Sequence, residues 1–179
     1  LKNNLKLHLD GARLFNALIA KKQTTSDYGK LFDSVSICLS KGLGAPIGSV
    51  LLGTKDFIKQ ARRIRKVFGG GMRQAGFIAA AGLFALDNHV ERLAIDHFHA
   101  KEIEKALSKN PMVESIIPVE TNILIFTVKR KTSAHEFVAK LNEHGILSFA
   151  TGKQSIRFVT HLDITTNKIE KICSLLKNI

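Results

Sequence analysis

The stretch from Ser34 to Thr54 constrains the fold more than any other part of the chain. Two β-rich runs, 34–39 and 49–52, flank a connection that is rich in glycine and contains a proline. This pattern predicts a strand, a tight connection and a second strand. Lys41 is the one charged residue of the stretch, at the end of the first predicted strand. Partial desolvation of this lysine would favour a neutral, nucleophilic amine that can form a Schiff base, although a lysine snorkelling out of an apolar turn fits equally well.

The glycines of this connection do not form a nucleotide-binding loop. Gly42, Gly44 and Gly48 have the spacing GxGxxxG, one residue longer than the dinucleotide fingerprint, and the chain contains no GxxxxGK[ST] motif.

A second group of candidate residues follows an alternating segment near the start of the chain. Residues 5–9 alternate Leu, Lys, Leu, His, Leu, which predicts a strand with His8 and Asp10 on the face opposite the leucines. Asp10 and Arg13 would then lie at the carboxyl edge of a sheet, where α/β folds bind ligands. The alternative is that Asp10 caps a helix over residues 12–20 and pairs with Arg13.

Composition narrows the class of protein. The 179 residues are 45% hydrophobic, with a net charge of +12, which raises nucleic acid as a partner. The one tight basic cluster, residues 62–66, has no flanking aromatics suited to base stacking, so we expect solvated charge rather than a nucleic-acid site. Cys38 and Cys173 are far apart, which favours a reducing, cytoplasmic setting without disulfides. We expect no membrane span and no signal peptide.

The first half of the chain continues with helices and a change of character. A polar loop is expected over residues 21–30 and an amphipathic helix over 55–68, followed by the glycine triplet 69–71. Residues 75–86 are apolar nearly all round, which predicts a helix buried in a core or against a partner subunit. The pattern then becomes amphipathic, so we place a domain boundary at Asn88.

The second half, residues 89–179, has the pattern of a small α+β domain. Strands are expected over 113–117 and 123–128, a helix with a Ser133/Glu136 capping box over 134–143, a hairpin of 146–149 with 155–160, and a last helix over 166–176. Arg157 stands within the hydrophobic last strand, where it needs an anionic partner unless it is a sheet-edge arginine turned to solvent. No group of His, Cys and carboxylates has metal-ligand spacing.

Three segments together resemble the threonine aldolases, pyridoxal-phosphate enzymes of the aspartate-aminotransferase-like fold. They are HLDGARLFNA, SICLSKGLGAPIGSVLLG, and RKVFGGGMRQAG with the distant IRFVTHLDI. The resemblance covers nearly the whole chain. It implies an α/β protein, in which residues 1–88 are the C-terminal part of the large cofactor-binding domain and residues 89–179 are the small C-terminal domain.

The resemblance also assigns roles to individual residues. Lys41 would carry pyridoxal phosphate as a Schiff base, and Asp10 would keep the pyridine nitrogen protonated so that the ring withdraws electrons. Arg13 and Arg157 would hold the substrate carboxylate, and His8 would line the cofactor site. Lys66 and Arg73 would reach toward an active site, either that of the same subunit or that of a neighbouring one. The reaction implied is cleavage of the Cα–Cβ bond of a β-hydroxy amino acid to glycine and an aldehyde.

In the threonine aldolases, the phosphate-binding residues and the ring stacked on the cofactor precede the HLDGAR motif. We therefore expect this chain to be a C-terminal portion that needs a separate N-terminal chain or a homo-oligomer, a dimer or tetramer, to act. Three alternatives stay open: a β-eliminating lyase of aromatic amino acids, a non-catalytic fragment of an aldolase, and a basic nucleic-acid-binding module.

Overall fold

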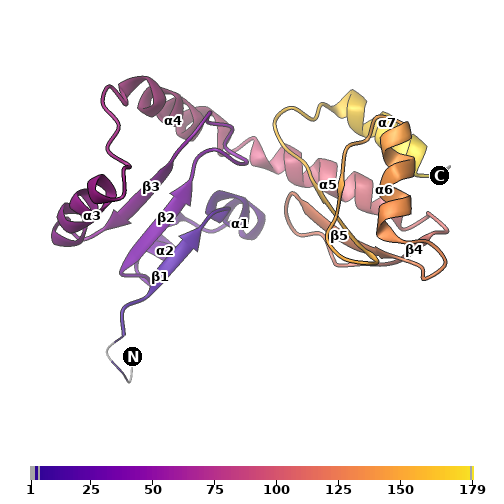
Figure 1. Ribbon diagram of the computed structural model, residues 1–179, viewed down its shortest axis with the longest axis horizontal. Helices are drawn as coiled ribbons and strands as arrows, with labels where there is room; N and C mark the ends of the chain where they lie inside the picture. The colour runs from indigo at the N-terminus through magenta and orange to yellow at the C-terminus, as the bar shows by residue number, and fades with distance from the viewer. Residues whose placement is uncertain (1–2, 4, 178) are drawn as a thin grey trace. The chain divides into compact units, whose positions relative to one another are not determined.

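A computed structural model describes residues 3, 5–177 and 179. The chain divides into two compact units, Leu1–Arg92 and Leu93–Ile179 (Figure 1). The division falls shortly after the change of pattern at Asn88, because a helix continues through Asn88 to His89. None of the helices in the described residues is both long and apolar enough to cross a bilayer.

The first unit is a three-stranded sheet with helices. Its elements are β1 (His8–Gly11), α1 (Leu14–Lys21), α2 (Thr25–Gly29), β2 (Ser34–Cys38), β3 (Ser49–Gly53), α3 (Lys55–Val67) and α4 (Gly76–His89). The strand order is β1-β2-β3, with β1 parallel and β3 antiparallel to β2. The strand, connection and strand expected around Lys41 are thus confirmed. The strand expected over residues 5–9 begins only at His8.

One alternative and one expectation for this unit were wrong. Helix α1 starts at Leu14, with Arg13 as its N-cap residue and no side-chain capping bond, so Asp10 does not cap it. Residues 21–30 are not all loop, because Thr24 and Asp27 form a reciprocal capping box that starts α2. A short capping motif within a polar stretch was enough to build one helical turn.

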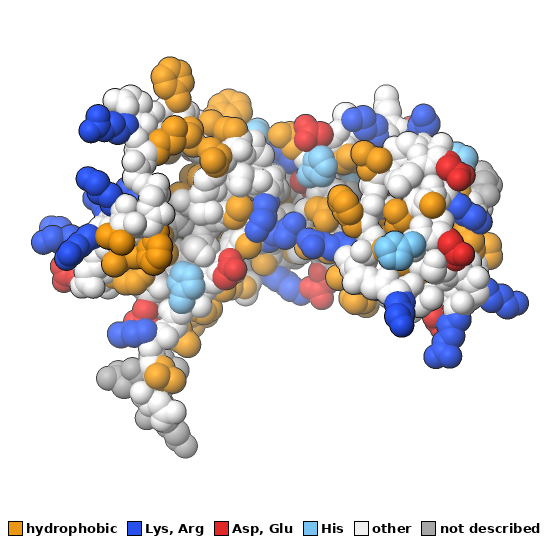
Figure 2. Space-filling view, viewed as in Figure 1, with side chains coloured by type: hydrophobic (Ala, Val, Ile, Leu, Met, Phe, Trp, Pro, Cys, Tyr) orange, Lys and Arg blue, Asp and Glu red, His pale blue; other side chains and the backbone are white. Residues whose placement is uncertain are grey.

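Unit 1 leaves much of its apolar surface exposed within this chain. Helix α3 has the expected amphipathic pattern but no buried residue, and every residue of β3 is exposed. In α4 only Gly82 and Ala85 are buried, whereas Phe77 is 91% exposed. Large apolar side chains accordingly appear on the surface in the space-filling view (Figure 2). The expectation that residues 75–86 lie in a core was therefore wrong, and packing against a partner stays a prediction.

Unit 2 is a four-stranded antiparallel sheet with three helices. Its elements are α5 (Leu93–Leu107), β4 (Val113–Ile116), β5 (Ile123–Val128), α6 (Ala134–Glu143), β6 (Phe149–Ala150), β7 (Ser155–Val159) and α7 (Thr166–Leu176). The strand order is β4-β5-β7-β6. The helices α6 and α7 and the strand β5 have the limits that the sequence predicts. The expected hairpin forms, but its first strand is only two residues long.

The core of unit 2 is closed. Alternate residues of β5 are fully buried, and Phe126 contacts two further rings edge-on, those of Phe137 and Phe158, at centroid distances of 5.8 and 5.2 Å. Ser133 and Glu136 form the predicted capping box at the start of α6. Gly145, with φ +74°, lies just beyond its end. Unit 2 therefore buries its own apolar side chains far more fully than unit 1.

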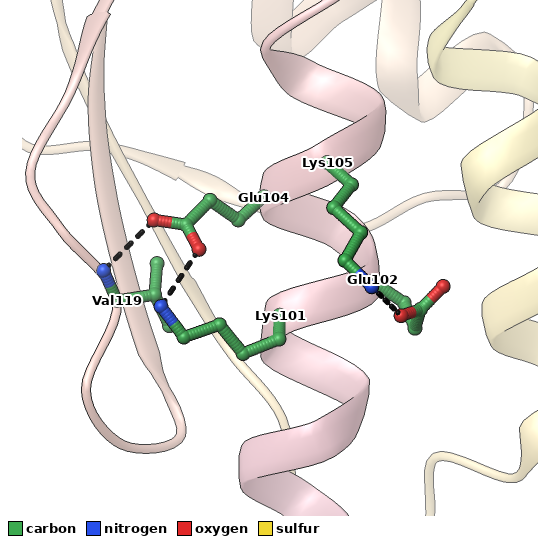
Figure 3. Close-up of polar contacts among 5 residues, drawn as sticks. All are labelled: Lys101, Glu102, Glu104, Lys105 and Val119. Atoms are coloured by element: carbon green, nitrogen blue, oxygen red, sulfur yellow. Dashed lines mark hydrogen bonds and ion pairs between the residues drawn. The ribbon is translucent and has the colours of Figure 1, made fainter.

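Glu104 ties α5 to the loop between β4 and β5. Its carboxylate accepts a hydrogen bond from the backbone N–H of the buried Val119 at 2.9 Å and an ion pair from Lys101 at 2.9 Å (Figure 3). A neighbouring pair, Glu102 with Lys105, lies on the same helix. Burial acts to raise the pKa of Glu104, but the bonds from Val119 and Lys101 outweigh it and hold the pKa below its ordinary value.

This contact predicts an acid-sensitive contribution to the stability of unit 2. Because the folded state lowers the pKa of Glu104, its contribution is complete above the unfolded value of about 4.5 and is lost as the pH falls through the folded value. Glu104→Gln keeps an acceptor for Val119 but cannot ionise, so we expect a shallower loss of stability as the pH falls below the unfolded value of about 4.5. Urea unfolding across this range measures it. Exposed Glu143→Gln is the control, and a variant that follows the wild-type acid limb would contradict the assignment.

Candidate active site

The carboxyl ends of β1 and β2 bring Asp10 and the Lys41 loop to one edge of the sheet. The two strands are parallel and adjacent, with Asp10 opposite Ser36. Gly11 is required here, since a Cβ atom would lie 2.6 Å from the Ser36 carbonyl oxygen. The Asp10 carboxylate is exposed at this edge and accepts a hydrogen bond from the Ala12 N–H at 3.2 Å, which orients it.

The loop that carries Lys41 is held by backbone hydrogen bonds. Leu39 N–H donates to Gly48 O at 2.9 Å, Ala45 N–H to Leu39 O at 3.0 Å, and Gly44 N–H to Lys41 O at 2.9 Å. Within unit 1 the Lys41 side chain is exposed, so the expected desolvation was wrong for this chain. The apolar neighbours Leu39 and Leu43 are buried, but they leave the amine exposed.

Arg13 lies close to the same loop. It begins α1 in a non-helical conformation, φ −137° and ψ 35°. It lines, with Cys38 and Gly42, a crevice of only about 10 Å³. A crevice of this volume holds at most one water molecule. It therefore reflects close packing of Arg13 against the loop and is not a ligand pocket.

Cys38 is a neighbour of Lys41 that the sequence interpretation used only to judge the redox setting. Its Sγ atom lies 3.5 Å from Ser40 Oγ. Burial acts to raise the pKa of this thiol, but hydrogen bonds with Ser40 and the positive charge of Lys41 bring it below the ordinary value. The Lys41 amine therefore lies near enough to the end of β2 for its charge to act on the Cys38 thiol. In the sequence, the proximity of this thiol and the amine is indicated by the spacing C-x-x-K.

His8 lies at the other end of β1. Its Nδ1 is 2.8 Å from Ser34 Oγ, a contact that links β1 to β2, and the ring is exposed. Lys66 and Arg73 are also exposed, on α3 and after the glycine triplet respectively. The proposed roles of these three residues at a cofactor site stay predictions.

Arg157 lies in unit 2, inside the sheet. β7 is flanked by β5 and β6, so the alternative of a sheet-edge arginine was wrong. Its Nε is buried and, in the described part of the chain, makes no hydrogen bond. Arg157 and Ser148, whose Oγ is likewise buried and without a hydrogen bond there, line a mostly apolar cavity of about 270 Å³. A buried donor without an acceptor in this cavity suits an anionic group of a ligand.

Comparison with known proteins identifies the family of this chain. The family described as Beta-eliminating lyase matches residues 1–131, which include both strands and the Lys41 loop. The chain belongs to the beta-eliminating lyase family. Two relatives are Low-specificity L-threonine aldolase 1 of Arabidopsis thaliana, 41% identical over 94% of this chain, and Low specificity L-threonine aldolase of Escherichia coli K12, 39% identical over 97%.

The match is limited to part of these relatives. This family member spans about half their length, 48% of the Arabidopsis protein and 50% of the Escherichia coli protein. Among solved structures, a threonine aldolase of Leishmania major aligns with 99% of this chain and 52% of its own, at a TM-score of 0.80 and 22% identity. A histidinol-phosphate aminotransferase of Clostridium acetobutylicum aligns at a TM-score of 0.69 and 13% identity. These structures show the fold: an α/β arrangement shared with aminotransferases.

Within the described residues, no group of three or more His, Cys, Asp or Glu side chains could hold a metal ion.

Proposed function

We propose that this chain carries the lysine-bearing part of a pyridoxal-phosphate-dependent threonine aldolase, which cleaves threonine or allo-threonine to glycine and acetaldehyde. The observation that carries the proposal is the placement of Asp10 and the Lys41 loop at the carboxyl edge of two adjacent parallel strands. Ligands of α/β sheets bind at this edge. The names of the relatives, matched over nearly the whole chain, support the same reaction.

The residues present fit part of pyridoxal phosphate. Asp10 offers an exposed carboxylate, oriented by the Ala12 N–H, for the pyridine nitrogen, and Lys41 offers an exposed amine for the aldehyde. When bound, the cofactor supplies an electron sink for the pair released at the substrate α-carbon.

The remaining residues would hold and orient the substrate. Arg13 and Arg157 present planar guanidinium groups suited to a carboxylate, and Arg157 already has a buried donor without an acceptor in the described part of the chain. Holding the carboxylate fixes which bond of the α-carbon can break. His8 would line the cofactor site only from the amino end of β1, where it contacts Ser34. Lys66 and Arg73 would reach toward this active site or that of a neighbouring subunit, as cations for the phosphate or the carboxylate.

A partner would complete the site. The apolar surface that unit 1 exposes on α3, α4 and β3 suits association with a second copy, a separate N-terminal chain, or both. An assembled form would also cover Lys41 and lower its solvent exposure. The unpaired Cys38 and Cys173 fit a reducing compartment, and we propose the cytoplasm.

Coexpression tests the proposal. We expect the chain, coexpressed with the half of the Escherichia coli relative that it does not match, to form a complex that releases glycine and acetaldehyde from threonine. The chain alone should give far less product, because it spans only about half the length of these relatives. A complex that forms, binds pyridoxal phosphate and leaves threonine unchanged would contradict the aldolase assignment.

A second reaction is favoured by the family description, which names β-elimination. The same complex should then release pyruvate and ammonia from tyrosine or tryptophan. Running both assays on one preparation separates the two reactions. The threonine aldolase names of the curated relatives make cleavage of threonine the expected outcome.

A further inference from the structure

His89 makes a contact with the Lys41 loop that the sequence does not suggest. Its Nδ1 lies 2.6 Å from the carbonyl oxygen of Leu43, two residues after Lys41 and 46 residues away in sequence. A carbonyl oxygen only accepts, so Nδ1 must carry the proton and donate. The contact is part-buried, where a hydrogen bond that is lost leaves an unsatisfied carbonyl.

Three other residues of α4 support this contact. The Phe84 ring meets His89 edge-on, with centroids 5.4 Å apart and an interplanar angle of 89°. Asn88 donates from Nδ2 to the Phe84 carbonyl at 2.8 Å, which secures the last turn. About two turns before His89, Gly82 lets Leu39 approach, since a Cβ atom there would be 3.0 Å from Leu39 Cδ1. Helix α4 thus contacts the Lys41 loop on both sides of the lysine.

The Leu43 carbonyl differs from the other acceptors of the loop, because its hydrogen bond comes from α4. Leu39, Lys41 and Gly48 supply the carbonyls that accept the bonds within the loop. The Leu43 carbonyl instead accepts from His89. A side chain at the end of one helix therefore fixes the peptide that follows the lysine turn.

We propose that His89 is a positioning residue, which holds the Lys41 loop through the Leu43 carbonyl and so sets the orientation of the Lys41 amine. The proposal rests on the proposed function only for the role of that amine. Its effect on the loop is independent of any cofactor.

The test compares two substitutions of His89 in the full chain. His89→Phe keeps a ring against Phe84 but has no donor, whereas His89→Asn keeps a donor near the position of Nδ1. We expect hydrogen exchange of residues 40–48 to accelerate about tenfold in the Phe variant and to return toward wild type in the Asn variant. His135→Phe, on the exposed surface of α6, is the control and should leave this segment unchanged.

A second readout connects the loop to the amine. Pyridoxal phosphate is added, trapped with borohydride and located by mass spectrometry, and we expect labelling of Lys41 to fall several-fold in His89→Phe and recover in His89→Asn. Wild-type exchange in residues 40–48 of the Phe variant, or an Asn variant no better than Phe, would overturn the proposal. Failure to label Lys41 in the wild type, with the exchange result as expected, would instead count against the proposed function alone.

Discussion

Lys41→Ala is expected to abolish the attachment of pyridoxal phosphate to this chain at the carboxyl edge of the sheet. The reason is chemical: the proposed site has one amine on the loop between β2 and β3, and alanine supplies none. In the coexpressed complex we expect threonine cleavage to fall at least about 10³-fold, the scale on which loss of a covalent catalytic group acts. Borohydride trapping followed by peptide mapping measures attachment, and aldehyde release measures cleavage.

The matched control is Lys30→Ala, which removes an exposed lysine from the same unit. It should keep both the trapped label on Lys41 and the cleavage rate. If Lys41→Ala bound and released the cofactor as the wild type does and still cleaved threonine, Lys41 would be an ordinary surface lysine of an apolar turn. The exposure of its side chain in unit 1 makes that comparison necessary.

Phe126→Ala is expected to destabilise unit 2 strongly. The ring is 1% exposed and lies between Phe137 and Phe158, so its removal loses both burial and two edge-on ring contacts. Such truncations cost about 3–5 kcal/mol, against a total of about 5–15 kcal/mol for a typical domain. We expect the melting temperature of unit 2 to drop by roughly 12 °C or more, followed by circular dichroism and by hydrogen exchange within residues 93–179.

Phe149→Ala makes the same chemical change where the ring is 78% exposed. It should alter the free energy of unfolding by no more than about 0.5 kcal/mol. Equal losses for the two variants would mean that the Phe126 cluster is not the centre of the core. A loss confined to unit 2, with exchange in residues 5–92 unchanged, would show that the two units unfold separately.

Local signals were sufficient for most of unit 2. Helix α6 has the predicted limits because its capping box and the following Gly145 act over a few residues. Alternation in residues 123–128 gave β5 in the same way, since one face of that strand is fully buried. These elements bury their apolar faces within the unit, so sequence pattern and tertiary packing agree.

The expectations failed where an element depends on groups beyond its own segment. The apolar pattern of residues 75–86 predicts burial, yet α4 exposes Phe77 and Phe84 within this chain. In the same way, the apolar neighbours of Lys41 suggested a desolvated amine, but the Lys41 side chain is exposed although Leu39 and Leu43 are buried. A sequence pattern predicts which surface of an element is apolar. Which other element or chain covers that surface depends on the tertiary structure and the assembly.

The sequence by itself determined the strand, connection and strand around Lys41, the residues at the end of β1, and their resemblance to a pyridoxal-phosphate enzyme. These depend on residue type and spacing along the chain. Only the tertiary structure decided that β1 is parallel to β2, which brings Asp10 to the edge that carries the Lys41 loop. Only it revealed His89 against Leu43, because a contact across 46 residues depends on how α4 packs and leaves no local pattern.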